Sequence, residues 1–483
     1  MELNNYDQFV GLEIHIQLKT ASKIFCGCSA SYGAEPNSSV CPVCLGYPGV
    51  LPTLNSEALR MAYVVARALN CRLATQTLFS RKNYFYPDLP KNYQISQHGA
   101  SVGQDGHLEV PIGGALRQIR IREVHLEEDA GKMIHVADLS LVDYNRTGTP
   151  LVEVVTEPDL RQGPEAEEFL QHFRRAVRYL GVCDGNMEEG SLRCDANISL
   201  NSRGRGLGAK VEVKNLNSFK FVRRALDFES QRQREVLEAG GAVTVETRLW
   251  NENRDVTETM RLKEDESDYR YFPEPDLPPF HPDTGFLAEL EAHQVEFPWV
   301  RAQRLIYEHS ITAQQAAFLT DERDWADFFE AAIVAGADSG QAAHWLAGDV
   351  RRLLNRDGRP LQDSALTPKR LAELLRLITA GDISGKIGKQ VLELVFSENR
   401  SPQEVVESHG LLRITEPALL TKVIDQVLAE NPVVAAQLAA GDGKPASFVV
   451  GQVMKHTDGR AEPRVIQSLL RTRYAAALEQ TSW

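Results

Sequence analysis

Strict alternation of apolar and polar residues over residues 10–19 is the sequence feature that most constrains the fold. Successive residues of a β-strand face opposite sides of a sheet, so this pattern predicts a strand with one buried face and one polar face. Residues 192–200 and 210–214 alternate in the same way. Over residues 117–126 the apolar phase shifts by one position, which predicts a β-bulge. The pattern of the first half of the chain therefore predicts a sheet with one buried apolar face and one charged face.

Two predicted helices, 164–180 and 218–239, interrupt these strands, and each ends at a glycine. Strands with one polar face and few helices predict an α+β domain, with a mostly antiparallel sheet and the helices on its apolar side. A proline-dense segment, 269–280, then breaks the regular pattern. After Phe297 the periodicity is helical, for example over residues 325–335, 368–379 and 417–429.

Four of the seven cysteines form two close pairs. Cys26 and Cys28 are separated by one residue, and Cys41 and Cys44 follow after twelve more. Two pairs of thiolates on two turns suit the tetrahedral coordination of Zn²⁺. Four thiolates leave no coordination position open for a substrate, so the zinc would be structural. The alternatives are two disulfides or four unrelated buried cysteines. We expect zinc, because an odd cysteine count does not indicate a secreted disulfide framework.

The polar faces of the predicted strands carry several carboxylates. Glu13 and His15 lie two residues apart and so share a face, and Glu212 lies between two lysines on another strand. Converging carboxylates repel one another unless a cation neutralises them, and Mg²⁺ prefers such ligands. The alternative is a solvated face with scattered ion pairs.

Phosphate-binding glycine motifs of the P-loop and dinucleotide-fold types are absent from the sequence. A nucleotide would therefore have to bind on the charged sheet. The net charge of −13 also argues against binding nucleic acid through bulk charge. No apolar run approaches the ~20 residues of a membrane span, and the polar N-terminus does not resemble a signal peptide. We therefore expect a cytoplasmic protein.

The last forty residues differ in charge from the rest of the chain. They carry six basic and three acidic residues, a net +3, which leaves −16 on the remainder. A locally basic helical segment suits a phosphate backbone, although a solvated helix face is an equally good explanation.

Several long motifs resemble the GatB family, the B subunits of aspartyl/glutamyl-tRNA amidotransferases. They are GLEIHIQLK (11–19), RKNYFYPD (81–88), HLEEDAGK (125–132), DYNRTGTP (143–150), residues 187–199, KNLNSF (214–219), residues 269–276 and FVVGQVMK (448–455). The resemblance covers essentially the whole chain.

The resemblance implies a cradle domain distantly similar to glutamine synthetase at residues 1–295, with a zinc-stapled insertion at 25–47. A helical domain at 296–403 and a small helical tail domain at 404–483 would follow. The implied reaction uses ATP and Mg²⁺ to phosphorylate the side-chain carboxylate of Glu-tRNA(Gln), of Asp-tRNA(Asn) or of both. Ammonia made in an A subunit then gives the amide, and a small C subunit completes a heterotrimer.

The resemblance also implies roles for individual residues. The implied catalytic residues are Glu13, His15, Glu128, Glu212 and Lys214, of which His15, Glu128 and Glu212 would bind Mg²⁺. Lys82 and Tyr84 would line the ammonia path, and Lys455, Arg460 and Arg464 would contact tRNA.

Two other functions fit the same sequence. One is a zinc-stabilised tRNA-binding scaffold without catalysis, and the other is a free-standing ligase resembling glutamine synthetase. Hydrolysis of ATP that depends on charged tRNA separates the kinase subunit from the scaffold, and activity without partners would indicate the ligase.

Overall fold

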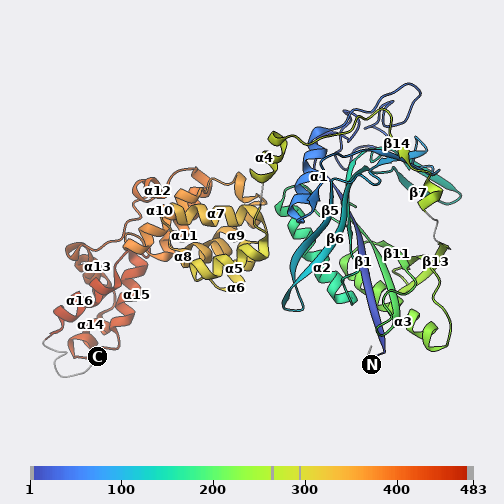
Figure 1. Cartoon of the computed structure of the whole chain (residues 1–483). Coiled ribbons are helices and arrows are strands. Elements are labelled where there is room, and N and C mark those ends of the chain that lie inside the picture. Colours follow the sequence, from blue (N-terminus) through green and yellow to red (C-terminus); the bar gives the residue numbers. More distant parts are fainter. Residues whose placement is uncertain (1–4, 263–265, 293–294, 476–483) are drawn as a thin grey trace. The chain divides into compact units, whose positions relative to one another are not determined.

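The computed structural model describes residues 5–262, 266–292 and 295–475. The chain divides into two compact units, Met1–Trp299 and Val300–Trp483 (Figure 1). All described strands lie in the first unit, and the described regular structure of the second is helical. The α+β architecture predicted from the alternating runs is confirmed.

The first unit is built on a nine-stranded sheet with the order β13-β12-β11-β10-β1-β9-β6-β5-β2. Every neighbouring pair is antiparallel except β11 and β12, which are parallel. The strands are β1 (Tyr6–Gln17), β2 (Arg72–Leu73), β5 (Gly103–Ile112), β6 (Ala115–Glu128), β9 (Pro150–Thr156), β10 (Leu192–Ser202), β11 (Val211–Leu216), β12 (Glu246–Asn251) and β13 (Val256–Leu262).

Two smaller sheets accompany the large one. One has the order β14-β3-β4, and the other is the hairpin β7–β8. Their strands are β3 (Ser80–Asn83), β4 (Tyr93–Ser96), β7 (Lys132–Val136), β8 (Leu139–Asp143) and β14 (Phe272–Pro273).

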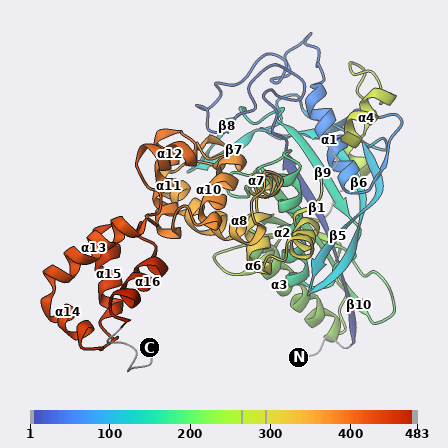
Figure 2. The same ribbon diagram turned by 90° about the vertical axis from the view of Figure 1, so that its left-hand side faces the viewer.

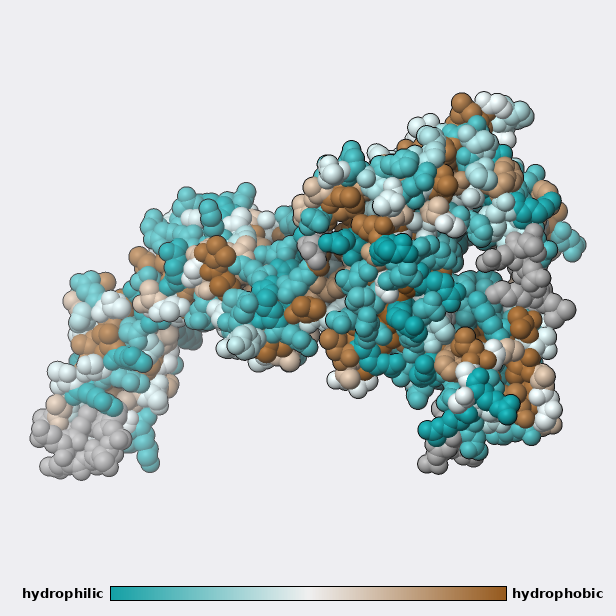
Figure 3. Space-filling model, viewed as in Figure 1, coloured by the Kyte–Doolittle hydropathy of each residue, from teal (hydrophilic) through white to brown (hydrophobic). Residues whose placement is uncertain are grey.

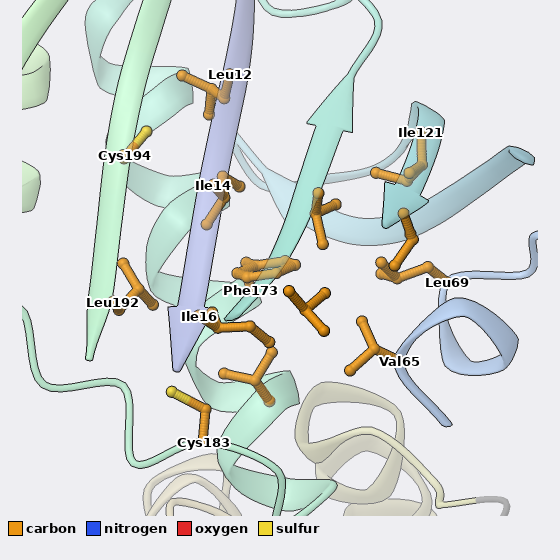
Figure 4. Packing of buried hydrophobic residues seen from close by; sticks show 14 of the residues in the cluster. Leu12, Ile14, Ile16, Val65, Leu69, Ile121, Phe173, Cys183, Leu192 and Cys194 are labelled. Atoms are coloured by element: carbon orange, nitrogen blue, oxygen red, sulfur yellow. The ribbon is translucent and has the colours of Figure 1, made fainter. Parts of the chain in front are cut away.

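Strand β1 shows why the sequence folds in this way. Its apolar residues Leu12, Ile14 and Ile16 are completely buried, and they pack among residues of neighbouring elements in Figure 4. Burial of each such side chain contributes roughly 1.5–3 kcal/mol. A slip of one residue would expose the whole set, so the apolar face fixes the register with β10 and β9.

Helices cover the apolar side of the sheet. They are α1 (Ser56–Ala68), α2 (Gly163–Tyr179) and α3 (Phe219–Glu238), and α4 (Thr284–Ala292) packs against α1. Phe173 of α2 points into the cluster beneath β1 (Figure 4). The two predicted helices are confirmed within one residue at each end. The sequence reading did not identify α1, whose start is capped by the Asn55 side chain.

The predicted bulge is also confirmed. The pairing of β6 with β9 shifts between Ile121 and Glu123. Beyond it the buried apolar residues of β6 are Val124 and Leu126. Because side chains alternate along a strand, His125 faces the opposite side together with Glu123 and Glu127.

The second unit contains two apolar clusters, one built from residues 305–411 and the other from residues 420–470. Its helices are α5 (Pro298–His309), α6 (Ala313–Leu319), α7 (Arg323–Val334), α8 (Ser339–Trp345), α9 (Arg351–Asp357), α10 (Pro368–Ala380), α11 (Gly385–Glu398), α12 (Pro402–Ser408), α13 (Pro417–Glu430), α14 (Pro432–Ala439), α15 (Ala446–His456) and α16 (Pro463–Arg473). Figure 2 shows many of them as short coiled ribbons, and a π-helical segment, Leu346–Val350, joins α8 to α9 without a break. Gly381, with φ +84°, ends α10 in the left-handed conformation that glycine adopts at little cost.

Within the described residues, no helix combines the length and the apolar character that crossing a bilayer requires. The face drawn in Figure 3 is mostly hydrophilic, with apolar residues interspersed.

Candidate functional site

The polar face of the central strands gathers side chains that are far apart in the sequence. Cross-strand register places His15 of β1 opposite Glu153 of β9, and Glu153 in turn opposite His125 of β6. Glu13 of β1 lies opposite Asp195 of β10. We call the six residues that converge here the carboxylate face: Glu13, His15, Glu127, Glu153, Asp195 and Glu212.

The first half of the carboxylate face contains His15, Glu127 and Glu153, whose ligand atoms all lie within 4.8 Å of one another. His15 Nε2 is 3.8 Å from Glu127 Oε1 and 3.7 Å from Glu153 Oε2. Ser96 Oγ donates a hydrogen bond to Glu127, and His125 Nε2 lies 2.6 Å from Glu153. One imidazole and two carboxylates at this spacing form a donor set of the kind that binds divalent cations.

Neighbouring charges shift the pKa values of His125, Glu153 and Lys82. Burial lowers the pKa of His125, but Glu153 together with Glu127 and Glu123 outweighs burial and raises that pKa to about 9. Burial raises the pKa of Glu153, yet the charges of His125 and His15 bring it well below its ordinary value. Burial also lowers the pKa of Lys82, and Glu127 is the first of several groups that raise it above its usual range. Glu153 is therefore ionised at neutral pH.

The second half contains Glu13, Asp195 and Glu212, again with ligand atoms within 4.8 Å. Lys214 Nζ is 2.6 Å from Asp195 and 3.1 Å from Glu212, so this predicted catalytic residue does lie in the face. Asn197 donates to Glu13 through its amide nitrogen. The amide oxygen of Asn197 is buried and has no hydrogen-bond partner among the described residues. A buried oxygen without a partner, beside three carboxylates, would be satisfied by a bound cation or by a water molecule that the cation holds.

Glu128 lies elsewhere. It follows Glu127 on β6, so its side chain points to the opposite side of the strand. It is 1% exposed, forms an ion pair with Lys91 and accepts a hydrogen bond from the Ile95 backbone at 2.8 Å. The structure therefore brings Glu127 rather than Glu128 to His15, and it brings Glu212 to Glu13 rather than to His15.

The sequence reading did not select Glu127, Glu153 or Asp195 as ligands. The alternation of β6 contains the signal for the first, because buried Val124 and Leu126 imply that Glu127 faces the polar side. Glu153 is a lone carboxylate in an otherwise apolar strand, and such residues are seldom buried without a partner.

A cavity of about 140 Å³ adjoins the second half of the carboxylate face. Glu13 lines it together with two cationic residues, Arg122 and Lys210, and the apolar residues Phe9 and Leu207 line it as well. Lys210 Nζ is 3.5 Å from Glu13. The cavity thus sets two basic side chains and apolar surface beside a set of cation ligands, and Arg122 also forms two hydrogen bonds with Glu157.

The remaining predicted residues of the first unit lie in aromatic surroundings. Lys82 Nζ is 4.9 Å from the centre of the Tyr269 ring, and Tyr84 packs edge-on against the same ring. Burial raises the pKa of the Tyr84 phenol, which stays neutral.

The four predicted zinc ligands come together. Cys26, Cys28, Cys41 and Cys44 have sulfur atoms within 4.8 Å of one another, and all are free thiols. The hydrogen bond with Cys26 lowers the pKa of Cys44 to about 4, and nearby Lys23 contributes in the same direction. We call residues 25–47, which contain the four cysteines, the cysteine knuckle. Four converging thiols fit a tetrahedral zinc site.

The predicted tRNA-contacting residues belong to the second unit. Lys455 is exposed in the last turn of α15 and Arg464 is exposed in α16, whereas Arg460 donates to the Gly410 carbonyl at 2.8 Å.

Comparison with known proteins gives a consistent result. A family model described as GatB/GatE catalytic domain matches residues 8–288, and one described as GatB domain matches residues 327–473. The B subunit of the aspartyl/glutamyl-tRNA(Asn/Gln) amidotransferase of Carboxydothermus hydrogenoformans is 45% identical over 479 residues, which cover 98% of this chain and 100% of the relative. The proteins of the same name from Moorella thermoacetica and Acaryochloris marina are 47% and 48% identical, with at least 96% of each chain covered.

Proposed function

Because the chain belongs to the GatB family, we propose that it acts as the B subunit of a cytoplasmic tRNA-dependent amidotransferase. Its substrates are Glu-tRNA(Gln), Asp-tRNA(Asn) or both, and the products are Gln-tRNA(Gln) and Asn-tRNA(Asn). An A subunit supplies ammonia and a small C subunit completes the assembly. The observation that supports this proposal best is the carboxylate face, where two sets of cation ligands meet on β1.

The chemistry requires activation of a poor acylating group. One oxygen of the side-chain carboxylate attacks the γ-phosphorus of ATP, the bond from that phosphorus to the β–γ bridging oxygen breaks, and ADP leaves. Ammonia then attacks the carbonyl carbon of the acyl phosphate, the bond from this carbon to the phosphate oxygen breaks, and the nitrogen loses a proton. Phosphoryl transfer depends mainly on positioning and on charge neutralisation.

The residues that would hold Mg²⁺ are His15, Glu127 and Glu153 in one set and Glu13, Asp195 and Glu212 in the other. This assignment keeps the predicted His15 and Glu212 and replaces Glu128 by Glu127. When bound, Mg²⁺ neutralises phosphate charge and thereby lowers the cost of bringing ATP to a carboxylate. Lys214 holds Asp195 and Glu212 in place and adds positive charge at the same face.

The cavity beside Glu13 is where we place the nucleotide. Its cations, Arg122 and Lys210, suit phosphate oxygens, and its apolar residues Phe9 and Leu207 suit a base. This placement needs no glycine-rich phosphate loop, which agrees with the absence of such a motif from the sequence.

Ammonia would reach the face past Lys82 and Tyr84. The aromatic rings of Tyr84 and Tyr269 lie beside this approach and would limit the access of water to it. Exclusion of water matters because an acyl phosphate hydrolyses where water can reach it.

Zinc in the cysteine knuckle would be structural. The knuckle contains little regular structure, and hydrogen bonds of Asn37 and Ser39 with residues 142–145 hold only part of it. A metal bound by four thiolates closes these turns and takes no part in the reaction.

The tail of the second unit is where we place tRNA binding, with Lys455, Arg460 and Arg464 as contacts. The apolar clusters support a tail domain shorter than the predicted 404–483. Val405 and Val406 pack in the cluster of residues 305–411, and the tail cluster begins at Leu420. A deletion from Arg413 onward therefore removes the tail core while leaving the preceding cluster complete.

Reconstitution with partner subunits tests the proposal. We expect ATP hydrolysis that depends on Glu-tRNA(Gln) or Asp-tRNA(Asn), and amide formation that ammonium chloride can drive without glutamine. Binding of charged tRNA without ATP hydrolysis would instead indicate a scaffold, and full activity of the isolated chain would indicate a free-standing ligase. Deletion from Arg413 onward should raise KM for the charged tRNA far more than it lowers kcat.

A further inference from the structure

A glycine-rich loop borders the cavity in which we place the nucleotide. It is the segment Arg-Gly-Arg-Gly-Leu-Gly of residues 203–208, which joins β10 to β11, and we call it the glycine loop. Leu207 and Gly208 line the cavity. The two strands that the loop joins supply Asp195 and Glu212 to the carboxylate face. The loop therefore lies at the rim of the site and is attached to two of its walls.

The backbone of the glycine loop can change conformation at low cost. Gly204 and Gly206 have φ values of +77° and +74°, in the left-handed region that glycine adopts without a penalty. A side chain built at either position would meet nothing within 4 Å, so close packing does not hold this part of the loop. At Gly208, in contrast, a side chain would lie 2.4 Å from the Leu200 carbonyl oxygen. The loop is thus packed against β10 at its last residue and open before it.

Hydrogen bonds hold the outer part of the loop within its own turn. The Asn201 side-chain amide donates to the Arg205 carbonyl at 3.5 Å and to the Leu207 carbonyl at 3.2 Å. Such bonds are kept when the turn moves as a unit. The first two backbone N–H groups of the loop donate to Asn5 and to Asp7, near the start of the chain. Leu207 is 61% exposed, so little apolar burial opposes a movement of the turn.

Arg205 differs from the other cations around the cavity. Its side chain is exposed, and within the described part of the chain it makes no hydrogen bond or ion pair. The basic residues of the cavity wall are engaged, because Arg122 forms two hydrogen bonds with Glu157 and Lys210 lies 3.5 Å from Glu13. A phosphate that enters the cavity therefore finds in Arg205 a guanidinium that no carboxylate has to release.

We propose that the glycine loop closes over the bound nucleotide and that Arg205 contacts its β- or γ-phosphate oxygens. This inference rests on the proposed function, which places the nucleotide beside Glu13. A guanidinium binds phosphate oxygens through two parallel N–H donors. The Mg²⁺ ligands lie on the sheet and Arg205 approaches from the loop, so the phosphate charge is neutralised from two sides. Leu207 moves with the turn and limits the access of water to the transferring group.

The surroundings of the loop favour a nucleotide over RNA. Residues 203–210 contain three basic residues and no acidic one, which a phosphate backbone would also suit. The loop, however, borders a concave cavity that Phe9 and Leu207 line with apolar surface, beside the ligand set of Glu13. A nucleotide uses an apolar wall for its base and a divalent cation for its phosphates, whereas an RNA backbone needs neither.

Equilibrium binding to the full chain, assembled with its partner subunits, tests the phosphate contact. The probes are a non-hydrolysable ATP analogue with Mg²⁺, and AMP, which lacks the β- and γ-phosphates. We expect Arg205→Ala to weaken binding of the analogue by about tenfold and to leave AMP binding unchanged, because only the analogue offers the contacted oxygens. Arg205→Lys should recover part of the loss, since it keeps the charge without the paired donors. Lys220→Ala, which removes an exposed cation from α3, is the matched control and should bind both probes as the wild type does.

Trypsin cleavage tests the closure of the loop. Trypsin cuts after arginine, and the loop contains Arg203 and Arg205. We expect the ATP analogue with Mg²⁺ to slow cleavage at these two positions. Cleavage after Arg254, an exposed residue in the turn between β12 and β13, should proceed at the same rate with and without the analogue. Unchanged cleavage of the loop would show that it does not close.

The binding results separate this inference from the proposed function. Wild-type affinity of Arg205→Ala for the analogue would overturn the inference, and so would an equal loss of affinity for AMP. Weaker binding of charged tRNA with unchanged binding of the analogue would overturn it in favour of RNA phosphate. The proposed function fails by a different result, in which the wild-type complex does not bind the analogue or Glu13→Gln binds it as the wild type does. The inference then falls together with the placement of the nucleotide.

Discussion

Two groups of charged side chains on the same sheet differ in how firmly their carboxylates are held by neighbouring residues. One is the carboxylate face on β1, β6, β9, β10 and β11. The other is a network between α3 and strands β12 and β13, which we call the guanidinium network: Glu229, Arg232, Glu246, Arg248 and Thr257. Both bring acidic residues together across long sequence separations.

In the guanidinium network every acidic group has fixed partners. Glu229 is completely buried and accepts hydrogen bonds from Arg232, Gln233 and Thr257. Glu246 accepts from Arg248 and Thr259. Planar guanidinium groups with such bonds lock the geometry of the carboxylates.

In the carboxylate face the charged partners of the acids are lysine and histidine, and four of its six residues are partly exposed. The His15, Glu13 and Asp195 side chains are each about one-fifth exposed. Among the described residues, Glu127 accepts one side-chain hydrogen bond, from Ser96. A lysine or a histidine is displaced by a metal ion more easily than a bidentate arginine. The difference teaches that a binding site is distinguished from a structural ion pair by carboxylate oxygens that a ligand can reach, and not by the number of acidic residues.

The largest effect that we expect is a loss of stability when the guanidinium network is broken. Glu229→Ala removes an acceptor shared by three donors and leaves the nearly buried Arg248 guanidinium without one of its partners. We expect a loss of about 3–5 kcal/mol in the free energy of unfolding, measured by urea denaturation. Glu235→Ala, an exposed position on the same helix, should change that energy by about 0.5 kcal/mol or less. Equal losses in the two variants would contradict the structural role of the network.

Glu127→Gln, in the carboxylate face, should lower activity strongly and stability little. The change keeps the shape of the side chain but removes a charged ligand, so we expect the rate of ATP-dependent amidation to fall by roughly 10²-fold or more. The free energy of unfolding should stay within about 1 kcal/mol of the wild type. Glu123→Gln, two alternations away on the same strand, serves as the control and should retain wild-type turnover. A Glu127→Gln enzyme with normal turnover would remove this carboxylate from the mechanism.

The cysteine knuckle provides a third kind of cluster, in which a metal would serve stability. We expect one zinc per chain by elemental analysis, and none in Cys41→Ser. Loss of the metal should lower stability by about 2 kcal/mol, since the knuckle turns lose their closure while the sheet core stays intact. Cys183→Ala, a buried cysteine outside the cluster, should retain its zinc even where it loses stability. Full zinc content in Cys41→Ser would show that the four thiols are not the ligands.

The smallest effect is stabilisation by Mg²⁺. At ten times its Kd, Mg²⁺ should add about 1.4 kcal/mol to the free energy of unfolding. Thermal unfolding with and without the ion measures this increment, which should vanish in Glu127→Gln and persist in Glu235→Ala. An increment of the same size in all three proteins would mean that the ion binds away from the carboxylate face.

The sequence was sufficient to predict the strands and helices whose patterns are local. The alternation of Leu12, Ile14 and Ile16 predicted β1, and the phase shift before Val124 predicted the bulge in β6. Cysteine spacing likewise predicted the knuckle cluster, since two short-range pairs need only one long-range contact to meet.

The composition of the carboxylate face could not be predicted from the sequence in the same way. It depends on which strands become neighbours, and no local pattern places β9 beside β1 or makes β11 and β12 parallel. The partnership of His15 with Glu153 is therefore a consequence of sheet order. The placement of Glu127 is different, because strand alternation alone indicates that it, and not Glu128, shares the polar side with His125.

The central position of β1 also has a consequence for synthesis of the chain. Tyr6 of β1 pairs with Ser202 of β10, so this strand waits for almost two hundred further residues before its longer pairing can be completed, although β9, which pairs with residues 13–17, emerges earlier. At ribosomal rates of about 5–20 residues per second, the delay is on the order of 10–40 seconds. Throughout that time a strand whose one face is aliphatic from Val10 to Ile16 is available for incorrect pairing. Non-local contacts of this kind make folding slow. We therefore expect the nascent chain to depend on chaperones until β10 has emerged from the ribosome.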